Sequence, residues 1–228
     1  MFFKKGTKEF YKKISYSQCG EDLIIDFIFG TLKIAKPTYL DIGAHHPYYL
    51  SNSAFFYQKE CMGVSVEPDP SLYAVIKKER PRELNLNVGV GLVSGESADF
   101  YIMNIPTLNT FSKSEAERYA AYPGKEIKEI VKLPLLTVNE IIQKNFDNKT
   151  PNFVSLDVEG MDLEIIKSFD FSKFRPQVFC IETLTYTEDN SEQKLTEIID
   201  YMLRQGYFLY ADTYINSVFV EEKIWKTR

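Results

Sequence analysis

Residues 39–57, YLDIGAHHPYYLSNSAFFY, contain the clearest indication of the architecture. A short apolar run ends at the acid Asp41, the small residues Gly43 and Ala44 follow, and the pattern then predicts a helix. A strand, a tight turn and a helix in this order are typical of the first unit of a nucleotide-binding sheet. The loop lacks the three glycines that a bound pyrophosphate requires, and Pro47 stands near the place of the third. We therefore expect this loop to bind something other than a dinucleotide.

The alternation of strands and helices continues on both sides of this stretch. Apolar runs predict strands at residues 62–68, 83–91, 152–160, 176–184, 207–212 and 216–222. Amphipathic patterns predict helices at residues 20–33, 50–60, 69–80, 137–146, 161–169 and 191–206. The less regular middle of the chain predicts an edge strand at 98–103, a short helix at 112–120 and an extended segment at 130–138 that Pro134 interrupts.

Continuous apolar strands joined by helices predict a parallel sheet that is covered on both faces. The last two strands are too close for a crossover helix, so we expect them to pair as a hairpin. The expected fold is α/β and Rossmann-like, with a seven-stranded, mostly parallel sheet of order 3-2-1-4-5-7-6 and one antiparallel strand. In such sheets a ligand binds beyond the carboxyl ends of the strands, here between strands one and four.

The whole chain, residues 1–228, is expected to form a single domain. Within it, residues 1–36 are expected to form an N-terminal helical lid, and residues 92–150 an irregular insertion that faces the substrate. Residues 104–126 carry Phe111, Tyr119 and Tyr122, which suit the wall of an acceptor pocket, and Tyr186 and Tyr214 are further candidates for the same wall.

The composition is ordinary for a soluble globular protein. The chain is 44% hydrophobic and 26% charged with a net charge of −5, so we expect no broad basic surface for a nucleic-acid backbone. No apolar run reaches the length of a transmembrane segment. Cys19, Cys61 and Cys180 are an odd number without CxxC spacing, which favours unpaired thiols in a reducing cytoplasm. Nothing in the sequence indicates an oligomeric state.

Four carboxylates fall at the predicted ends of neighbouring strands: Asp41, Glu67, Asp157 and Glu182. An acid in the position of Glu67 accepts both hydroxyl hydrogens of an adenosine ribose. Nicotinamide dinucleotides and S-adenosylmethionine share this requirement, but S-adenosylmethionine has no phosphate and suits the glycine-poor loop better. Asp41 is then expected to hold its ammonium, and the backbone amides of residues 43–45 its carboxylate. An NAD-linked oxidoreductase and a non-catalytic nucleotide-binding domain of the same fold remain the alternatives.

Five segments together resemble the FkbM-type methyltransferases: YSQCGED (16–22), YLDIGAHHPYYLSNSAFFY (39–57), GVSVEPDP (63–70), TLNTFS (107–112) and VSLDVEGMDLEIIKSFDF (154–171). The resemblance departs at Pro47, where the family usually has a glycine. It implies a class I methyltransferase fold and S-adenosylmethionine-dependent O-methylation of a sugar, glycan or natural product. It does not specify the acceptor, and an amine or a carboxylate remains the alternative.

Transfer to a sugar hydroxyl needs a base or a metal because the pKa of the hydroxyl is high. The catalytic candidates are Asp157, Glu159 and His45. Asp157, Glu159 and Glu182 together also offer the oxygen ligands that Mg²⁺ prefers. Direct proton acceptance by one of these carboxylates is the alternative, as is a structural role for Glu159 as a helix cap.

Further cofactor-binding candidates surround the same loop. Gln18 is expected to donate to the cofactor carboxylate, and Glu21 or Asp22 to hold the ammonium, unless the two acids only favour a helix N-terminus. Ser51 and Asn52 are expected to line the aminoacyl tail or to cap their helix, and Asn87 to face the adenine edge. The complete expected cofactor set is Gln18, Glu21, Asp22, Asp41, Gly43, Ala44, His45, Ser51, Asn52, Glu67, Asn87 and Asp157.

Overall fold

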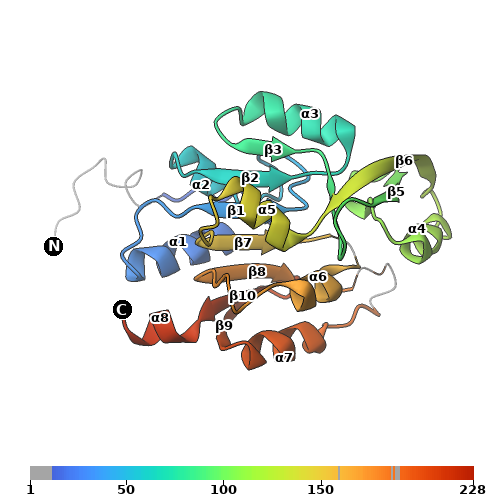
Figure 1. Ribbon diagram of the computed structural model, residues 1–228. Coiled ribbons are helices and arrows are strands. Elements are labelled where there is room, and N and C mark those ends of the chain that lie inside the picture. Colours follow the sequence, from blue (N-terminus) through green and yellow to red (C-terminus); the bar gives the residue numbers. More distant parts are fainter. Residues whose placement is uncertain (1–11, 159, 186, 188–190) are drawn as a thin grey trace.

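The computed structural model describes residues 12–158, 160–185, 187 and 191–228 and is built around a seven-stranded sheet (Figure 1). Its strands are β1 (Tyr39–Ile42), β2 (Gly63–Val66), β3 (Leu84–Leu86), β7 (Phe153–Leu156), β8 (Val178–Glu182), β9 (Tyr207–Asp212) and β10 (Asn216–Glu221). They lie in the order β3-β2-β1-β7-β8-β10-β9, with β10 antiparallel to both of its neighbours. Numbered within this sheet alone, the order is the predicted 3-2-1-4-5-7-6.

Helices cover both faces of this sheet, as predicted. Side chains of α5 (Val138–Asn145), α6 (Asp162–Ser168) and α7 (Thr196–Arg204) pack against one face. Side chains of α1 (Glu21–Thr31), α2 (Ala54–Gln58) and α8 (Glu222–Lys226) pack against the other. Helix α3 (Pro70–Glu79) lies along the edge strand β3 (Figure 1). It begins as expected, with Asp69 as its cap and Pro70 at its first position.

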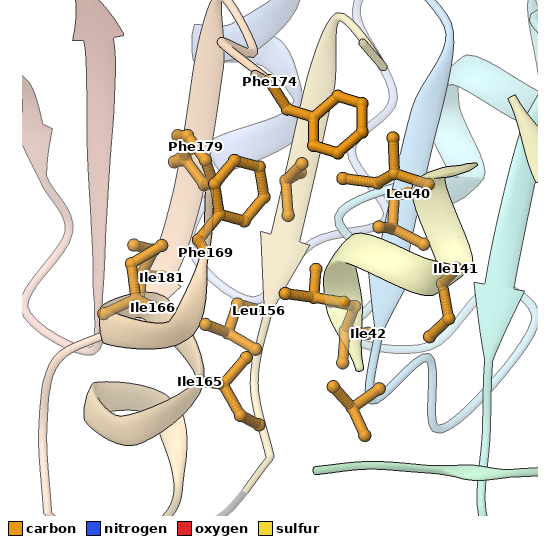
Figure 2. Close-up of a cluster of buried hydrophobic side chains, with 14 of the residues drawn as sticks. Leu40, Ile42, Ile141, Leu156, Ile165, Ile166, Phe169, Phe174, Phe179 and Ile181 are labelled. Carbon is orange, nitrogen blue, oxygen red and sulfur yellow. The ribbon is translucent and has the colours of Figure 1, made fainter. Parts of the chain in front are cut away.

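The strands alternate between two cores. In β1, Leu40 and Ile42 belong to the core under α5 and α6, whereas Tyr39 belongs to the core under α1 and α2. Figure 2 shows the first core, in which Ile165 lies beside Leu156, the residue that pairs with Ile42 on the neighbouring strand. Each fully buried Leu or Ile stabilises the fold by about 1.5–3 kcal/mol, so the two cores hold the strand ends in fixed register.

The middle of the chain forms a second, three-stranded sheet of order β4-β6-β5, from β4 (Gly89–Val90), β5 (Ser97–Met103) and β6 (Ile127–Leu136). The predicted single strand at 83–91 is wrong, because its first half pairs with β2 while its second half leaves to pair with β6. Pro134 does not end β6. It takes the last pairing position opposite β5, just before the pairing with β4 begins at Leu135.

The connection from β5 to β6 contains the 3-10 helix η2 (Pro106–Leu108) and α4 (Lys113–Ala120). In Figure 1 this second sheet and α4 lie beyond one end of the large sheet. Helix α5, although it falls within residues 92–150, packs in the core of the large sheet.

Two further predictions are corrected at element boundaries. The helix expected over 191–206 begins only at Thr196, because Lys194 and Leu195 pair with the segment after β8 instead. The short helix α8 follows β10 and was not expected. Cys19, Cys61 and Cys180 are free thiols, as predicted. Within the described ranges, no helix has both the length and the apolar character needed to cross a bilayer.

Candidate functional site

A cavity of about 570 Å³ lies at the carboxyl ends of β1, β2, β7 and β8. The start of β10 and residues of the second sheet, among them Phe100 and Phe111, complete its wall. Adjacent strands are about 4.8 Å apart, so the ends of β2 and β8 are separated by about 14 Å. The cavity has the volume of a small-molecule site and is long enough for a nucleoside at one end and a second group at the other.

Gly43 forms the turn at the end of β1. Its φ angle is +82°, and a Cβ placed on it would lie 1.8 Å from the backbone oxygen of Asp157. The small residue is therefore required because two strand-end loops touch there. The amides of Gly43 and Ala44 both donate to the carbonyl of Val66, at 3.0 and 3.1 Å. Both amides are therefore engaged within the protein, whereas the sequence predicted them as donors to a ligand carboxylate; Gly43 still lines the cavity.

Glu67 lies at the end of β2 and lines the cavity. Its two carboxylate oxygens accept hydrogen bonds from the backbone amides of His45, at 2.8 Å, and Asp69, at 2.7 Å. Burial raises the pKa of Glu67 to about 8, although the two amides act in the opposite direction. The carboxylate is thus fixed between the loops after β1 and β2, where the sequence predicted a ribose-binding acid.

Asp41 is buried but does not line the cavity. Its carboxylate accepts a hydrogen bond from Ser53 and is hydrogen-bonded by Ser155. Burial raises the pKa of Asp41, and the charge of Arg80 opposes this shift. Asp41 therefore belongs to a network beneath the loop, and the structure does not place it where it was expected to hold an ammonium.

This network is centred on Arg80, whose side chain is fully buried. Arg80 donates to Ser53 at 2.8 Å, to the Tyr39 hydroxyl at 3.2 Å and to Glu83 at 2.6 Å. Glu83 also accepts from Ser65 at 2.7 Å. The network joins β1, β2 and the loop before α2. The sequence offered no signal for it, because an Arg and a Glu three residues apart at a helix end are typical of an exposed pair.

The segment before α1 approaches the cavity through Gln18, which lines it. The Glu21 carboxylate is fully buried and accepts from Thr213 at 2.6 Å and from Asn216 at 3.1 Å. Burial acts to raise its pKa, but these hydrogen bonds outweigh it and the pKa of Glu21 is lowered. Asp22 accepts from the Tyr16 amide at 2.7 Å and from neighbouring serines. Neither acid lines the cavity; both fix the segment that carries Gln18.

Asn52 and Asn216 line the cavity, and each keeps a buried amide oxygen without a hydrogen-bond partner. Their amide nitrogens are engaged: Asn52 donates to Ser155 at 3.2 Å, and Asn216 donates to Glu21. Since unpaired buried acceptors are unfavourable, both oxygens suit a ligand that donates hydrogen bonds. Asn52 was a predicted cofactor-binding residue, whereas Asn216 was not, because its position in a hairpin strand carries no signal.

Ser51, Ala44 and Asn87 do not line the cavity. Ser51 accepts from the amide of Ala54 at 3.1 Å, but the N-cap of α2 is Ser53, so the predicted cap at Ser51 or Asn52 is wrong. Asn87 donates to the carbonyls of Glu67 and Pro68 at 2.9 and 2.8 Å. Asn87 therefore braces the loop that carries Glu67.

Asp157 and Glu182 lie at the ends of the adjacent strands β7 and β8, and both line the cavity. The pKa of Asp157 is raised to about 6. Burial is the main cause and the charge of Asp41 adds to it, while a hydrogen bond with Glu182 acts in the opposite direction. Asp162, at the start of α6, accepts from the amide of Val158 at 3.1 Å. Asp162 was not predicted as a site residue, yet it fixes the loop that follows Asp157.

His45 lines the cavity with a φ angle of +53°. Burial, followed by the charge of His46, lowers the pKa of His45, while Asp69 acts in the opposite direction. Its imidazole is therefore neutral at neutral pH. Glu159 and Tyr186, two further candidates, lie outside the described residues. Among those that the structure does describe, no group of three or more His, Cys, Asp or Glu side chains forms a metal-binding cluster.

Of the predicted aromatic wall, Phe111 and Tyr214 line the cavity. Phe111 packs against Phe100 with ring centroids 4.6 Å apart. Tyr119 is buried in a small apolar cluster of the second sheet, and Tyr122 packs against that cluster. Tyr119 and Tyr122 therefore stabilise the second sheet and α4 and do not line the cavity.

Residues 41–209 match the family model described as the methyltransferase FkbM domain. None of the curated proteins compared with this sequence matches it. Among solved structures, a TehB-like SAM-dependent methyltransferase from Corynebacterium glutamicum has 10% identity and a TM-score of 0.45, covering 94% of this chain and 92% of that one. An O-methyltransferase from Bacillus cereus in complex with SAH has 8% identity and a TM-score of 0.45, covering 89% and 80%. With both TM-scores below 0.5, we draw no conclusion about function from these two structures.

Proposed function

This chain belongs to the FkbM methyltransferase domain family, and from that premise we propose that it transfers a methyl group from S-adenosylmethionine to a hydroxyl of a small-molecule or glycan acceptor. The observation that carries the proposal is the position of Glu67, fixed by two amides at the end of β2 and facing the cavity. Family membership gives no support to an NAD-linked oxidoreductase, and the glycine-poor loop does not favour one.

The residues present fit the cofactor. Glu67 would hold the ribose hydroxyls, and the apolar wall that includes Val88 and Leu108 would take the adenine. The unpaired amide oxygens of Asn52 and Asn216 would accept from the ammonium, with Gln18 donating to the carboxylate. In this proposal Glu21, Asp22, Asp41, Ser51, Ala44 and Asn87 hold the site in shape rather than touch the ligand.

Asp157 is the proposed base. When bound, the cofactor supplies a methyl group on a positively charged sulfur, which is a good leaving group, so positioning and proton removal are the tasks left to the protein. Asp157 lines the cavity at the strand next to β1, and its pKa of about 6 leaves it largely ionised at neutral pH. Glu182, its hydrogen-bonded neighbour, shares the proton that Asp157 accepts. His45, neutral and in the same wall, orients the acceptor.

Mg²⁺ bound by Asp157, Glu182 and Glu159 is retained as the second route. The adjacent carboxylates of Asp157 and Glu182 are the oxygen ligands that this ion prefers. The ion would orient two acceptor oxygens and lower the pKa of one. Activity that disappears with a chelator and returns with Mg²⁺ would favour this route, and activity that survives chelation would favour direct proton transfer to Asp157.

Calorimetric titration tests the proposed cofactor. We expect S-adenosylhomocysteine to bind in a one-to-one ratio, and NAD to give no measurable heat at the same concentrations. Binding of NAD with no binding of S-adenosylhomocysteine would overturn the proposal.

A cytoplasmic location remains a prediction from the free thiols.

A further inference from the structure

A second group of side chains lines the cavity at its β8–β10 end, far from Glu67. We call Glu182, Thr187, Glu192 and Tyr214 the hairpin corner, because Tyr214 lies in the turn between β9 and β10. The chain after β8 supports it: the amide of Leu195 donates to the carbonyl of Thr183 at 2.8 Å. This pairing holds the segment that carries Glu192 beside the hairpin.

Tyr214 is fixed at three points. Its amide donates to Asp212 at 2.8 Å, its carbonyl accepts from Lys194 at 2.7 Å, and its hydroxyl donates to Glu192 at 2.8 Å. Its φ angle is +76°, in the left-handed region that is unfavourable for a residue with a Cβ. The residue is nevertheless 61% exposed while it lines the cavity. The left-handed conformation turns the chain between β9 and β10, and the three hydrogen bonds hold the exposed ring at the cavity wall, where a ligand can pack against it.

The charges at this end of the cavity are of one sign. Glu192 contributes a carboxylate to the wall and accepts from Thr187 at 3.3 Å, and Glu182 and Asp157 form a hydrogen-bonded acidic pair in the same wall. No Lys or Arg lines the cavity within the described part of the chain. The nearby cation Lys194 is engaged by Asp212 at 2.6 Å and by the carbonyl of Tyr214. An anionic group placed here would meet like charges without a balancing cation.

We propose that the hairpin corner binds an acceptor that carries a cationic amine beside its reacting hydroxyl. The Glu192 carboxylate pairs with the ammonium, and the exposed ring of Tyr214 packs against the adjacent carbon atoms and contributes a cation–π contact. The amine is the recognised group, and the hydroxyl towards Asp157 is the one methylated. This inference rests on the proposed function and deepens it by naming the charge of the acceptor.

Three probes of one shape test the inference: 4-aminocyclohexanol, cyclohexane-1,4-diol and 4-hydroxycyclohexanecarboxylate, which are cationic, neutral and anionic. Each is titrated by NMR into the full-length protein saturated with S-adenosylhomocysteine. We expect the cation to bind at least tenfold more tightly than the anion, with the diol between them. Glu192→Gln should abolish the difference between cation and diol, and Tyr214→Ala should weaken both at least threefold.

Tyr73→Ala is the control, since Tyr73 lies on α3 and does not line the cavity; it should leave the order of the three affinities unchanged. Equal or tighter binding of the anion would overturn the inference. So would an order that Glu192→Gln leaves unchanged, or the absence of binding by all three probes at 100 mM. If S-adenosylhomocysteine itself does not bind to the native protein, the proposed function fails first; if it binds and the charge order is absent, only this inference fails.

Discussion

The backbone oxygen of Asp157 occupies the space that a side chain on Gly43 would need: a Cβ there would lie 1.8 Å from it. The loop that begins the cavity and the loop that carries the proposed base are thus in direct contact. Gly43→Ala must push them apart, and it also places a Cβ at a φ of +82°. We expect it to lower the melting temperature and to weaken S-adenosylhomocysteine binding at least tenfold.

Gly95→Ala is the matched control for this variant. Gly95 has a φ of +83°, but no atom lies within 4 Å of the position of its added Cβ. It should show only the backbone strain of about 1–2 kcal/mol, with ligand binding retained. Equal loss of binding in both variants would show that the contact between Gly43 and Asp157 is not what shapes the cavity.

The pKa of Glu67 predicts how nucleoside binding varies with pH. Because that pKa is about 8 in the unliganded protein, Glu67 is mostly protonated at pH 6 and ionised at pH 9. Only the ionised carboxylate accepts from both ribose hydroxyls, so adenosine, which has no amine, should bind more tightly as the pH rises through about 8. Calorimetry at several pH values measures this, with 2′-deoxyadenosine as the ligand control. Tighter binding of adenosine at pH 6 than at pH 9 would contradict the role of Glu67.

The rate of methyl transfer should follow the ionisation of Asp157. With S-adenosylmethionine at saturating concentration, so that the ionisation of Glu67 does not affect the rate, a base with a pKa of about 6 gives a rate that increases from pH 5 to pH 7 and is then constant. Asp157→Asn should lower the rate about 10²–10⁴-fold and remove this dependence. The measurement is S-adenosylhomocysteine formation with the best acceptor found. If a His45→Asn variant loses the pH dependence while Asp157→Asn keeps it, His45 is the base.

The buried Arg80 network predicts a large effect on stability. Arg80→Ala leaves Glu83 buried without its cationic partner, which is expected to lower the free energy of unfolding by about 3–5 kcal/mol. Arg204→Ala is the control, because Arg204 is an exposed arginine at the end of α7 and should change stability by less than about 1 kcal/mol. Urea denaturation of both variants distinguishes them, and similar losses would show that burial of the Arg80 pair is not what matters.

The seven-stranded sheet could be predicted from the sequence because its order depends on local patterns. The apolar runs of β1, β7 and β8 are buried on both faces, and the short link between β9 and β10 allows only a hairpin. Glu67 and Asp157 were predicted in the cavity wall for the same reason: the carboxyl ends of parallel strands meet at one edge.

Other parts of the site depend on contacts between distant residues that no local pattern encodes. Asn216 lines the cavity with its amide oriented by Glu21, 195 positions away in the sequence. Asp41 has the spacing of a ligand-binding acid, yet its side chain points into a network organised by Arg80. The departure of β4 to the second sheet follows from pairing with β6, more than 40 residues later.

A crystal structure of the protein grown with S-adenosylhomocysteine tests the central claim most directly. The account predicts the ligand across the ends of β1 and β2, with both ribose hydroxyls about 2.6–3.2 Å from the Glu67 carboxylate and the ammonium at Asn52 and Asn216. Ligand density elsewhere, or a ribose that does not touch Glu67, would contradict it.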